Sequence, residues 1–256
     1  MALRILLTND DGVDAPGLAI LQAIAAQLSD DVWTVAPDSN QSGAGHRFTL
    51  RRELEVDQKS ERIFAITGGS PADCVVAGMS HLLGDKGPDL VLSGVNAGQN
   101  LGDIIHASGT AAGAREGALQ GALGIAMSQS IDFEKGLDIV WDNAVRYGAA
   151  AVRAILAAHD GEDIYYNVNF PTCATDVVTG ISVVPHQRFS RSPFRYYASR
   201  NAGKFFVAIP ETPLPLTREH DFEVLNKDHA VTVTPLLLQQ TDMATTDRLQ
   251  GKLTLG

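Results

Sequence analysis

Apolar and polar residues follow two alternating patterns over roughly the first 160 residues. Short apolar runs typical of buried strands lie at residues 3–8, 32–36, 90–92 and 125–127. Apolar residues at helical spacing occur at 15–28, 71–83, about 110–122 and 134–158. Parallel strands need a crossover connection, usually a helix, so this alternation predicts an α/β fold with a Rossmann-like parallel-sheet core.

The pattern changes after about residue 160. Short β-like runs then follow at 165–170, 181–184, 204–209 and 230–235. The basic and aromatic connector at 188–197 could stack a nucleobase or form a subunit contact, and we favour the contact. We predict a single α/β domain over 1–256, in which about 1–160 form the core that carries the site. Residues from about 161 to 256 are expected to be a β-rich C-terminal extension for oligomerisation, as a homodimer or homotetramer.

Composition narrows the class of protein. Apolar residues make up 45% of the 256 positions, and no apolar run reaches the roughly 18 residues of a membrane span. The formal net charge of −10 argues against binding to a nucleic-acid duplex. The two cysteines, Cys74 and Cys173, lie far apart and form no zinc-finger or disulfide pattern. We expect a cytoplasmic protein with no membrane contact.

Two adjacent carboxylates follow the first predicted strand. Asp10 and Asp11 repel each other unless a cation or hydrogen-bond donors intervene. Loops that follow parallel strands meet at the carboxyl edge of the sheet, so Ser42 and Asn96 are candidates to join the pair. Ligands that are all oxygen favour Mg²⁺, Mn²⁺ or Ca²⁺ over zinc. A simple turn with a helix cap explains an acidic pair before Gly12 equally well, and this alternative stays open.

Three glycine-containing loops are candidates for phosphate binding. The loop at 42–45 could surround an anion with backbone N–H groups, although an ordinary turn is the more common explanation. Residues 108–110 precede a predicted helix, where they could bind a phosphate or only cap the helix. The segment 93–102 interleaves three glycines with amide side chains directly after a strand. That arrangement favours a closely shaped site.

Together these segments resemble the SurE family of metal-dependent 5'-nucleotidases, the stationary-phase survival proteins. The matching stretches are ILLTNDDG at 5–12, AP and SGAG within 36–45, SGVNAGQNLG at 93–102 and SGT at 108–110. They span most of the first 120 residues in the family's order. The combination is far more specific than any one of its members.

The resemblance implies a site and a reaction. It implies one divalent cation, Mg²⁺ or Mn²⁺, held by Asp10, Asp11, Ser42 and Asn96, of which Asp10, Asp11 and Asn96 are also catalytic. It implies phosphate contacts from Asn9, Gly43, Ser108, Gly109 and Thr110. The implied reaction is metal-dependent hydrolysis of nucleoside 5'-monophosphates to nucleoside and phosphate, with 3'-monophosphates as a further option.

Three departures from the family pattern bear on substrate preference more than on the reaction. His106 and Ala107 stand where the family commonly has an aromatic residue before SGT. Ala97 replaces a frequent histidine, and Arg47 follows His46 where smaller residues are usual.

Two other functions are compatible with the same loops. A phosphatase that forms an aspartyl-phosphate is disfavoured, because its nucleophile and acid usually stand one residue apart. A nucleotide sensor would bind through these loops without turnover. For hydrolysis, Asp10 or Asp11 would orient the attacking water, and His46 and His106 are candidates to protonate the leaving oxygen.

Overall fold

One large sheet forms the centre of the structure, a computed structural model that describes residues 3–132, 138–209 and 215–253. Within these ranges nine strands join in the order β3-β4-β2-β1-β5-β6-β7-β11-β8. They are β1 (Arg4–Thr8), β2 (Asp31–Pro37), β3 (Glu55–Ser60), β4 (Ile63–Thr67), β5 (Leu90–Ala97), β6 (Leu123–Gln129), β7 (Ile164–Phe170), β8 (Ile181–Val183) and β11 (Val231–Leu237). Neighbouring strands from β4 to β7 run parallel, whereas β3 and β11 run antiparallel to β4 and β7. The predicted α/β fold is confirmed.

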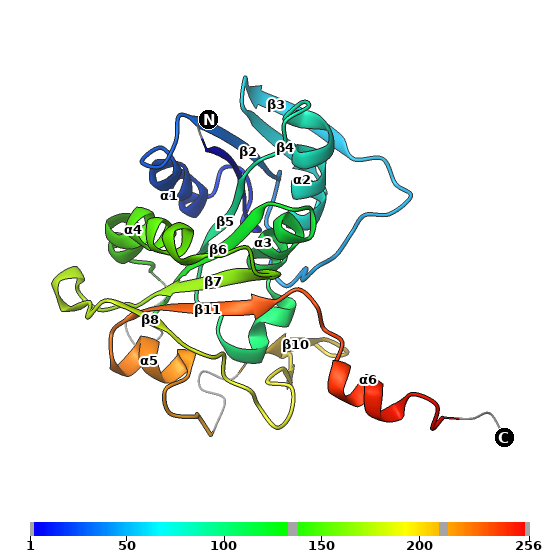
Figure 1. The fold of residues 1–256 in the computed structure, drawn as a ribbon, viewed down its shortest axis with the longest axis vertical. Helices are drawn as coiled ribbons and strands as arrows, with labels where there is room; N and C mark the ends of the chain where they lie inside the picture. Colours follow the sequence, from blue (N-terminus) through cyan, green and yellow to red (C-terminus); the bar gives the residue numbers. More distant parts are fainter. Residues whose placement is uncertain (1–2, 133–137, 210–214, 254–256) are drawn as a thin grey trace.

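Helices cover both faces of the sheet (Figure 1). The helices α1 (Pro16–Ala25) and α4 (Asp142–Ala158) pack on one face, and α2 (Pro71–Ala77) and α3 (Gly109–Leu119) pack on the other. Successive side chains of a strand point to opposite faces, so Ile5 and Leu7 of β1 join the core under α1 and α4, while Leu6 joins the core under α2. Burial on both faces explains why the central strands are continuous apolar runs.

Small residues let α3 lie directly against the sheet. A Cβ atom at Gly113 would lie 2.7 Å from Ser93 Oγ and 2.8 Å from Thr8 Cγ2. A Cβ atom at Gly117 would lie 2.6 Å from Val91 Cβ. Any larger residue would push the helix away from β1 and β5. This close approach brings the N-terminus of α3 to the end of β1.

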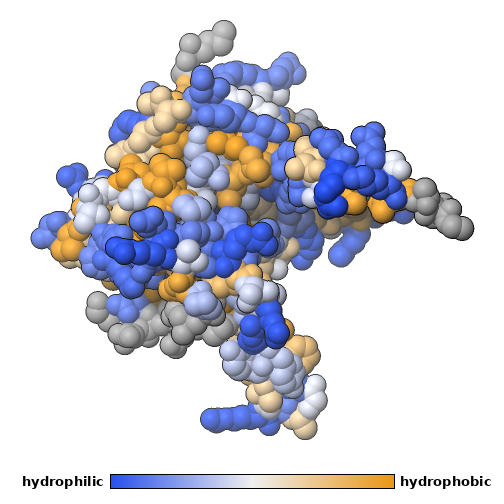
Figure 2. Space-filling view, turned by 60° about the horizontal axis from the view of Figure 1, so that its bottom comes forward, coloured by the Kyte–Doolittle hydropathy of each residue, from blue (hydrophilic) through white to orange (hydrophobic). Residues whose placement is uncertain are grey.

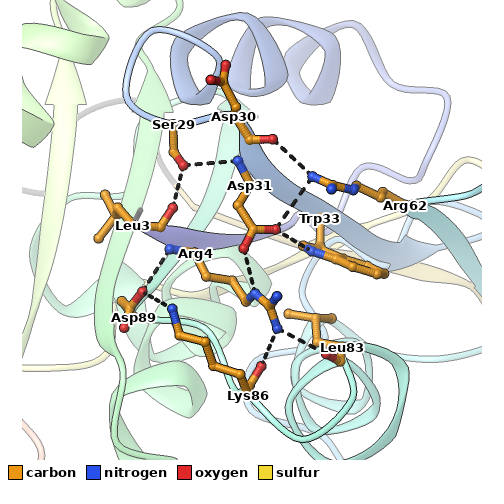
Figure 3. A network of polar contacts seen from close by, with 10 residues as sticks. All are labelled: Leu3, Arg4, Ser29, Asp30, Asp31, Trp33, Arg62, Leu83, Lys86 and Asp89. Atoms are coloured by element: carbon orange, nitrogen blue, oxygen red, sulfur yellow. Dashed lines mark hydrogen bonds and ion pairs between the residues drawn. The ribbon is translucent and has the colours of Figure 1, made fainter. Parts of the chain in front are cut away.

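A polar network ties together the amino ends of the central strands (Figure 3). Arg4 Nε donates to Asp31 Oδ2 at 2.8 Å, which joins the start of β1 to the start of β2. The backbone N–H of Arg4 donates to Asp89 Oδ2 at 2.7 Å, next to the start of β5. Trp33 Nε1 also donates to Asp31, at 2.9 Å. These contacts thus hold the amino ends of β1, β2 and β5 together.

The second half of the chain contributes both to the main sheet and to separate elements. β7, β11 and β8 extend the main sheet, whereas β9 (Arg195–Ala198) and β10 (Phe205–Ala208) pair only with each other. The short helix α5 (Asp221–Lys227) packs near β11, and α6 (Met243–Leu249) extends away from the body without a buried residue (Figure 1). In the described ranges we find no helix with the length and apolar character of a membrane span.

Short helical turns complete the connections. A π-helical turn, η1 (Gly78–Leu82), continues α2, and 3-10 turns occupy η2 (Gly102–Ala107) and η3 (Thr175–Val177). The predicted helix over 71–83 is thus present as α2 followed by η1.

Several predicted boundaries differ from the structure. The helix predicted over 134–158 begins only at Asp142, and residues 133–137 lie outside the described ranges. Its start is set by tertiary contacts, because Asn143 Nδ2 donates to the Pro171 carbonyl at 2.8 Å and the Ala144 N–H donates to Gln129 Oε1 at 3.1 Å. Alternating residues near 48–56 are also typical of a strand, and β3 begins only at Glu55. β4, α5 and α6 were not predicted, and β9 falls largely in the segment 188–197 that was expected to be a connector.

Candidate active site at the carboxyl edge of the sheet

β1 lies at the point of the sheet where the order of the strands changes direction. From β1 the chain continues to β2 on one side and later to β5 on the other, which creates a switch point at the carboxyl ends of these strands. The loops meet there by direct hydrogen bonds. The Gln41 N–H, after β2, donates to the Asp10 carbonyl at 2.7 Å, and the Ala97 N–H, at the end of β5, donates to Asp11 Oδ2 at 3.2 Å.

Asp10 is the most buried acidic group of this edge. Its side chain follows β1 directly, and only 4% of the residue is exposed. Oδ1 accepts a hydrogen bond from Thr110 Oγ1 at 2.7 Å. Burial raises the pKa of Asp10 to about 6, the Thr110 hydroxyl opposes this shift, and the neighbouring Asp11 adds to it. An ionised Asp10 is therefore a desolvated negative charge that a cation would stabilise.

Asp11 is half-buried and is held from two sides. Asn40 Nδ2 donates to Oδ1 at 3.3 Å, and the Ala97 N–H donates to Oδ2. Burial raises the pKa of Asp11 as well, and the hydrogen bond from Ala97 opposes the rise. The two carboxylates are thus oriented by the loop after β2, the end of β5 and the first turn of α3.

Ser42 and Gly43 are exposed on the loop that follows β2. The Ser42 N–H donates to Asn40 Oδ1 at 2.8 Å, so Asn40 links this loop to Asp11. The loop is also joined to the start of α3, because the Gly45 N–H donates to the Ala107 carbonyl at 3.1 Å. Gly43 has a φ of +77°, although a side chain there would meet only open space. The backbone conformation, and not crowding, therefore favours glycine at this position.

Asn96 lies near the end of β5 and is half-buried. Its Nδ2 donates to the Gly98 carbonyl at 2.7 Å. This hydrogen bond orients the amide and leaves Oδ1 as the atom that could ligate a cation.

The segment 108–110 begins α3 and faces Asp10. Ser108 Oγ accepts from the Ala111 N–H at 3.0 Å, so the capping role left open by the sequence is present. Thr110 Oγ1 is occupied by Asp10, and a Cβ atom at Gly109 would lie 2.7 Å from Asp10 Cβ. Capping does not prevent the free N–H groups of this first turn from binding an anion.

Asn9 is fully buried, and its side chain closes the turn after β1. Nδ2 donates to the Gly12 carbonyl at 2.9 Å, and Oδ1 accepts from the Gly12 N–H at 3.2 Å. The side-chain contacts of Asn9 in the structure are therefore to the turn that places Asp10 and Asp11.

A cleft of about 760 Å³ opens beside α3, and Ser108, His46 and His106 are among the residues that line it. His46 Nε2 contacts Glu116 Oε2 at 2.8 Å, and Gln120 Nε2 donates to the other oxygen of Glu116 at 2.8 Å. The Glu116 pKa is lowered by His46 and Gln120, although burial acts against this. Both histidines proposed as proton donors thus line the same cleft as Ser108, which caps α3.

Asn40 and Glu116 belong to the candidate site but were not predicted from the sequence. Asn40 stands two residues before Ser42, where an asparagine that bonds its own loop is a recognisable turn signal. Glu116 pairs with His46 across 70 positions of the sequence, and no local pattern predicts such a contact.

The side chains available for a metal are two carboxylates and neutral oxygen groups. The described part of the chain contains no group of three or more His, Cys, Asp or Glu side chains that could hold a metal ion. Mg²⁺ and Mn²⁺ are commonly bound through one or two carboxylates, with water in the other positions. The burial of Asp10 beside a second carboxylate fits such a cation, because the cation would neutralise the repulsion between them.

Comparison with known proteins shows the family of the chain. The family described as "Survival protein SurE" matches residues 5–192. A 5'-nucleotidase SurE from Methylobacterium radiotolerans is 43% identical over 250 residues, which cover 96% of this chain and 97% of the relative. A 5'-nucleotidase SurE from Rhizobium meliloti is 41% identical over 256 residues, with 99% of each chain covered.

A solved structure gives the same result for the fold. The crystal structure of the SurE protein from Aquifex aeolicus is 32% identical in sequence and has a TM-score of 0.84. The similarity covers 96% of this chain and 98% of that one. By its family match, its relatives and its fold, this chain belongs to the SurE family.

Proposed function

We propose that this protein is a hydrolase, a metal-dependent phosphatase that converts nucleoside 5'-monophosphates to nucleoside and phosphate. The observation that carries the proposal is the pairing of Asp10 with Thr110, which joins a buried carboxylate to the N-terminus of a helix. A cation at the carboxylate and the positive end of the helix would act on the same phosphate. The 5'-nucleotidase SurE relatives support this substrate class, and 3'-monophosphates are a second substrate to test.

Asp10, Asp11, Ser42 and Asn96 are the residues proposed to hold one divalent cation, Mg²⁺ or Mn²⁺. The two carboxylates would supply negative charge, and the Ser42 hydroxyl and Asn96 Oδ1 would complete the protein ligands. When bound, the cation supplies positive charge and Lewis acidity at the phosphoryl oxygens. Without it, a phosphate dianion approaching two aspartates on a protein of net charge −10 would be repelled.

The phosphate is proposed to bind at the start of α3 and at the loop after β2. The Ser108 hydroxyl with the backbone N–H groups of Gly109 and Thr110 would stabilise the equatorial oxygens in the transition state, and Gly43 would contribute a backbone N–H. Asn9 would act by fixing the turn, since its amide is bonded to Gly12. Asp10 or Asp11 would orient the attacking water.

Protonation of the leaving ribose oxygen is proposed to fall to a histidine of the cleft. His106 is exposed there and has no hydrogen-bond partner in the described residues, whereas His46 is held by Glu116. A histidine can donate this proton only in its imidazolium form.

Phosphate release from a panel of nucleoside monophosphates tests the proposal. The purified protein is assayed with Mg²⁺, with Mn²⁺ and with a chelator, on 5'- and 3'-monophosphates of each base. We expect release with metal, and loss of release with chelator. Binding without phosphate release under every metal condition would favour a nucleotide sensor and contradict the proposal.

We also propose that the protein works in the cytoplasm as a homodimer or homotetramer. Both cysteines are free, and Cys74 is buried, which suits a reducing compartment. The hairpin β9–β10 and the helix α6 expose apolar side chains that a second copy could cover, as the predicted role of residues 161–256 requires.

A further inference from the structure

The cleft beside α3 is lined by two arginines whose guanidinium groups have no partner among the described residues. Arg115 comes from α3, and Arg188 comes from the connector after β8. Neither guanidinium forms a hydrogen bond or ion pair with any residue that the structure describes, and Arg115 Nε is buried without a partner. A buried N–H group without a partner costs free energy, so an anionic ligand at this place would be stabilised.

The acidic groups of the same cleft are already engaged. Asp103 contacts His186 at 3.5 Å and accepts from the Phe189 N–H at 2.8 Å. Asp242 caps α6 and accepts from the backbone N–H and the hydroxyl of Thr245. None of these contacts is made with Arg115 or Arg188, so the N–H groups of both guanidiniums stay available to an anionic ligand.

The position of Arg115 relates it to the proposed phosphate site. Ser108, Ala111, Ala112 and Arg115 follow one another at helical spacing along the side of α3 that lines the cleft. Seven residues correspond to about 10 Å along the helix, and side chains of a helix tilt toward its N-terminus. A group bound by Arg115 would thus be separated from the phosphate at Ser108 by a spacer such as a ribose ring.

We propose that Arg115 and Arg188 form a subsite for a second phosphate, carried on the ribose of the substrate. The favoured substrate class is then a nucleoside 3',5'-bisphosphate, cleaved at the 5' position. This inference rests on the proposed function for the position of the scissile phosphate. Arginine suits the role because its planar guanidinium binds phosphate through two parallel hydrogen bonds.

The test compares kcat/KM for 5'-AMP and for adenosine 3',5'-bisphosphate in the wild type and in Arg115→Gln and Arg188→Gln. We expect the wild type to prefer the bisphosphate by about tenfold or more, as for one charge-assisted hydrogen-bonded pair. Arg115→Gln should bring this ratio close to one, and Arg188→Gln should reduce it. The control is Arg146→Gln, an exposed arginine of α4 on the other face of the sheet, which should keep the wild-type ratio.

Two readouts separate failure of this inference from failure of the proposed function. Hydrolysis of 5'-AMP with a wild-type ratio near one, or a preference that survives both substitutions, would overturn the subsite alone. Absence of all hydrolysis would overturn the proposed function. In that case, calorimetry in the presence of a chelator measures binding without turnover. The subsite requires that the wild type bind the bisphosphate more tightly than 5'-AMP and that Arg115→Gln show no such difference.

Discussion

At the scale of single residues, the site depends on how closely the start of α3 approaches Asp10. The hydrogen bond between Thr110 and Asp10 can form because Gly109 has no side chain. The same contact explains a buried carboxylate whose pKa is raised to about 6. In the unfolded chain this group ionises near its ordinary pKa of 3.8, so the metal-free fold loses stability as the pH rises from about 4 to 6. The loss amounts to about 3 kcal/mol and is complete above that window.

The substitution Gly109→Ala should disturb the site more than the fold. Its Cβ would lie 2.7 Å from Asp10 Cβ and 2.9 Å from Oδ2, so helix and carboxylate must separate. We expect a loss of stability of about 1–3 kcal/mol. We also expect at least a tenfold loss in kcat/KM, measured with Mn²⁺ on a nucleoside monophosphate. Gly87→Ala is the matched control, because a Cβ there meets open space. Equal activity of the two variants would mean that the contact at Gly109 does not matter for the site.

At the scale of elements, the two ends of the central strands have different roles. The carboxyl ends of β1, β2 and β5 lead into the loops that carry the candidate site, and the amino ends are joined by Arg4, Asp31 and Asp89. Hydrogen bonds from Arg4 and Trp33 lower the pKa of Asp31, and the hydrogen bond from the Arg4 N–H lowers that of Asp89. The network should therefore set the stability of the sheet rather than the chemistry.

Asp31→Asn should lower the free energy of unfolding by about 1 kcal/mol and leave the activity of the folded protein intact. Because the pKa of Asp31 is lowered in the fold, its contribution is present above pH 4 or so and is lost as the pH falls. The difference between variant and wild type should thus disappear in acid, as measured by denaturant unfolding. The control is Asp30→Asn. Asp30 accepts a hydrogen bond from Arg62 through its backbone carbonyl, which the substitution leaves in place. A difference that persists in acid would show that the carboxylate charge is not the cause.

Much of the element order could be predicted, because the central strands are buried on both faces. Continuous apolar runs such as 3–8 and 90–92 come from that burial, and they locate β1 and β5. The start of α4 was not predicted because side-chain contacts over long sequence separations set it. The helices α5 and α6 were not predicted because their apolar patterns are too short. The same limit applies to Asn40 and Glu116 in the site, whose partners lie 29 and 70 residues away.

At the scale of the whole molecule, two segments protrude from the body. Figure 2 shows the hairpin β9–β10 at the bottom of the view and the helix α6 at the right. The hairpin exposes 58% of Phe205, 62% of Phe206 and 65% of Tyr196. An isolated two-stranded hairpin is marginally stable in water, so a second copy packed against it would stabilise it.

The double substitution Phe205→Ser with Phe206→Ser should therefore reduce the molecular mass in solution. We expect light scattering at micromolar concentration to give an oligomer for the wild type and a smaller species for the variant. Val145→Ser is the control, as it removes an apolar side chain of similar exposure (54%) from α4. A wild-type protein that is already monomeric would contradict the prediction.

Asp10 and Asp11 are proposed to hold a divalent cation at the switch point of the sheet. Melting curves of the wild type and Asp10→Asn, with and without Mn²⁺, test whether they do. Asparagine keeps the volume of the side chain but removes a buried charge, so the metal-free variant should be at least as stable as the wild type above pH 6. Mn²⁺ at about 100 times its dissociation constant should stabilise the wild type by about 2.7 kcal/mol, and the variant should lose most of that gain together with turnover. If Asp10→Asn unfolds the metal-free protein, and Mn²⁺ shifts both melting curves equally, Asp10 is a structural cap and the cation binds elsewhere.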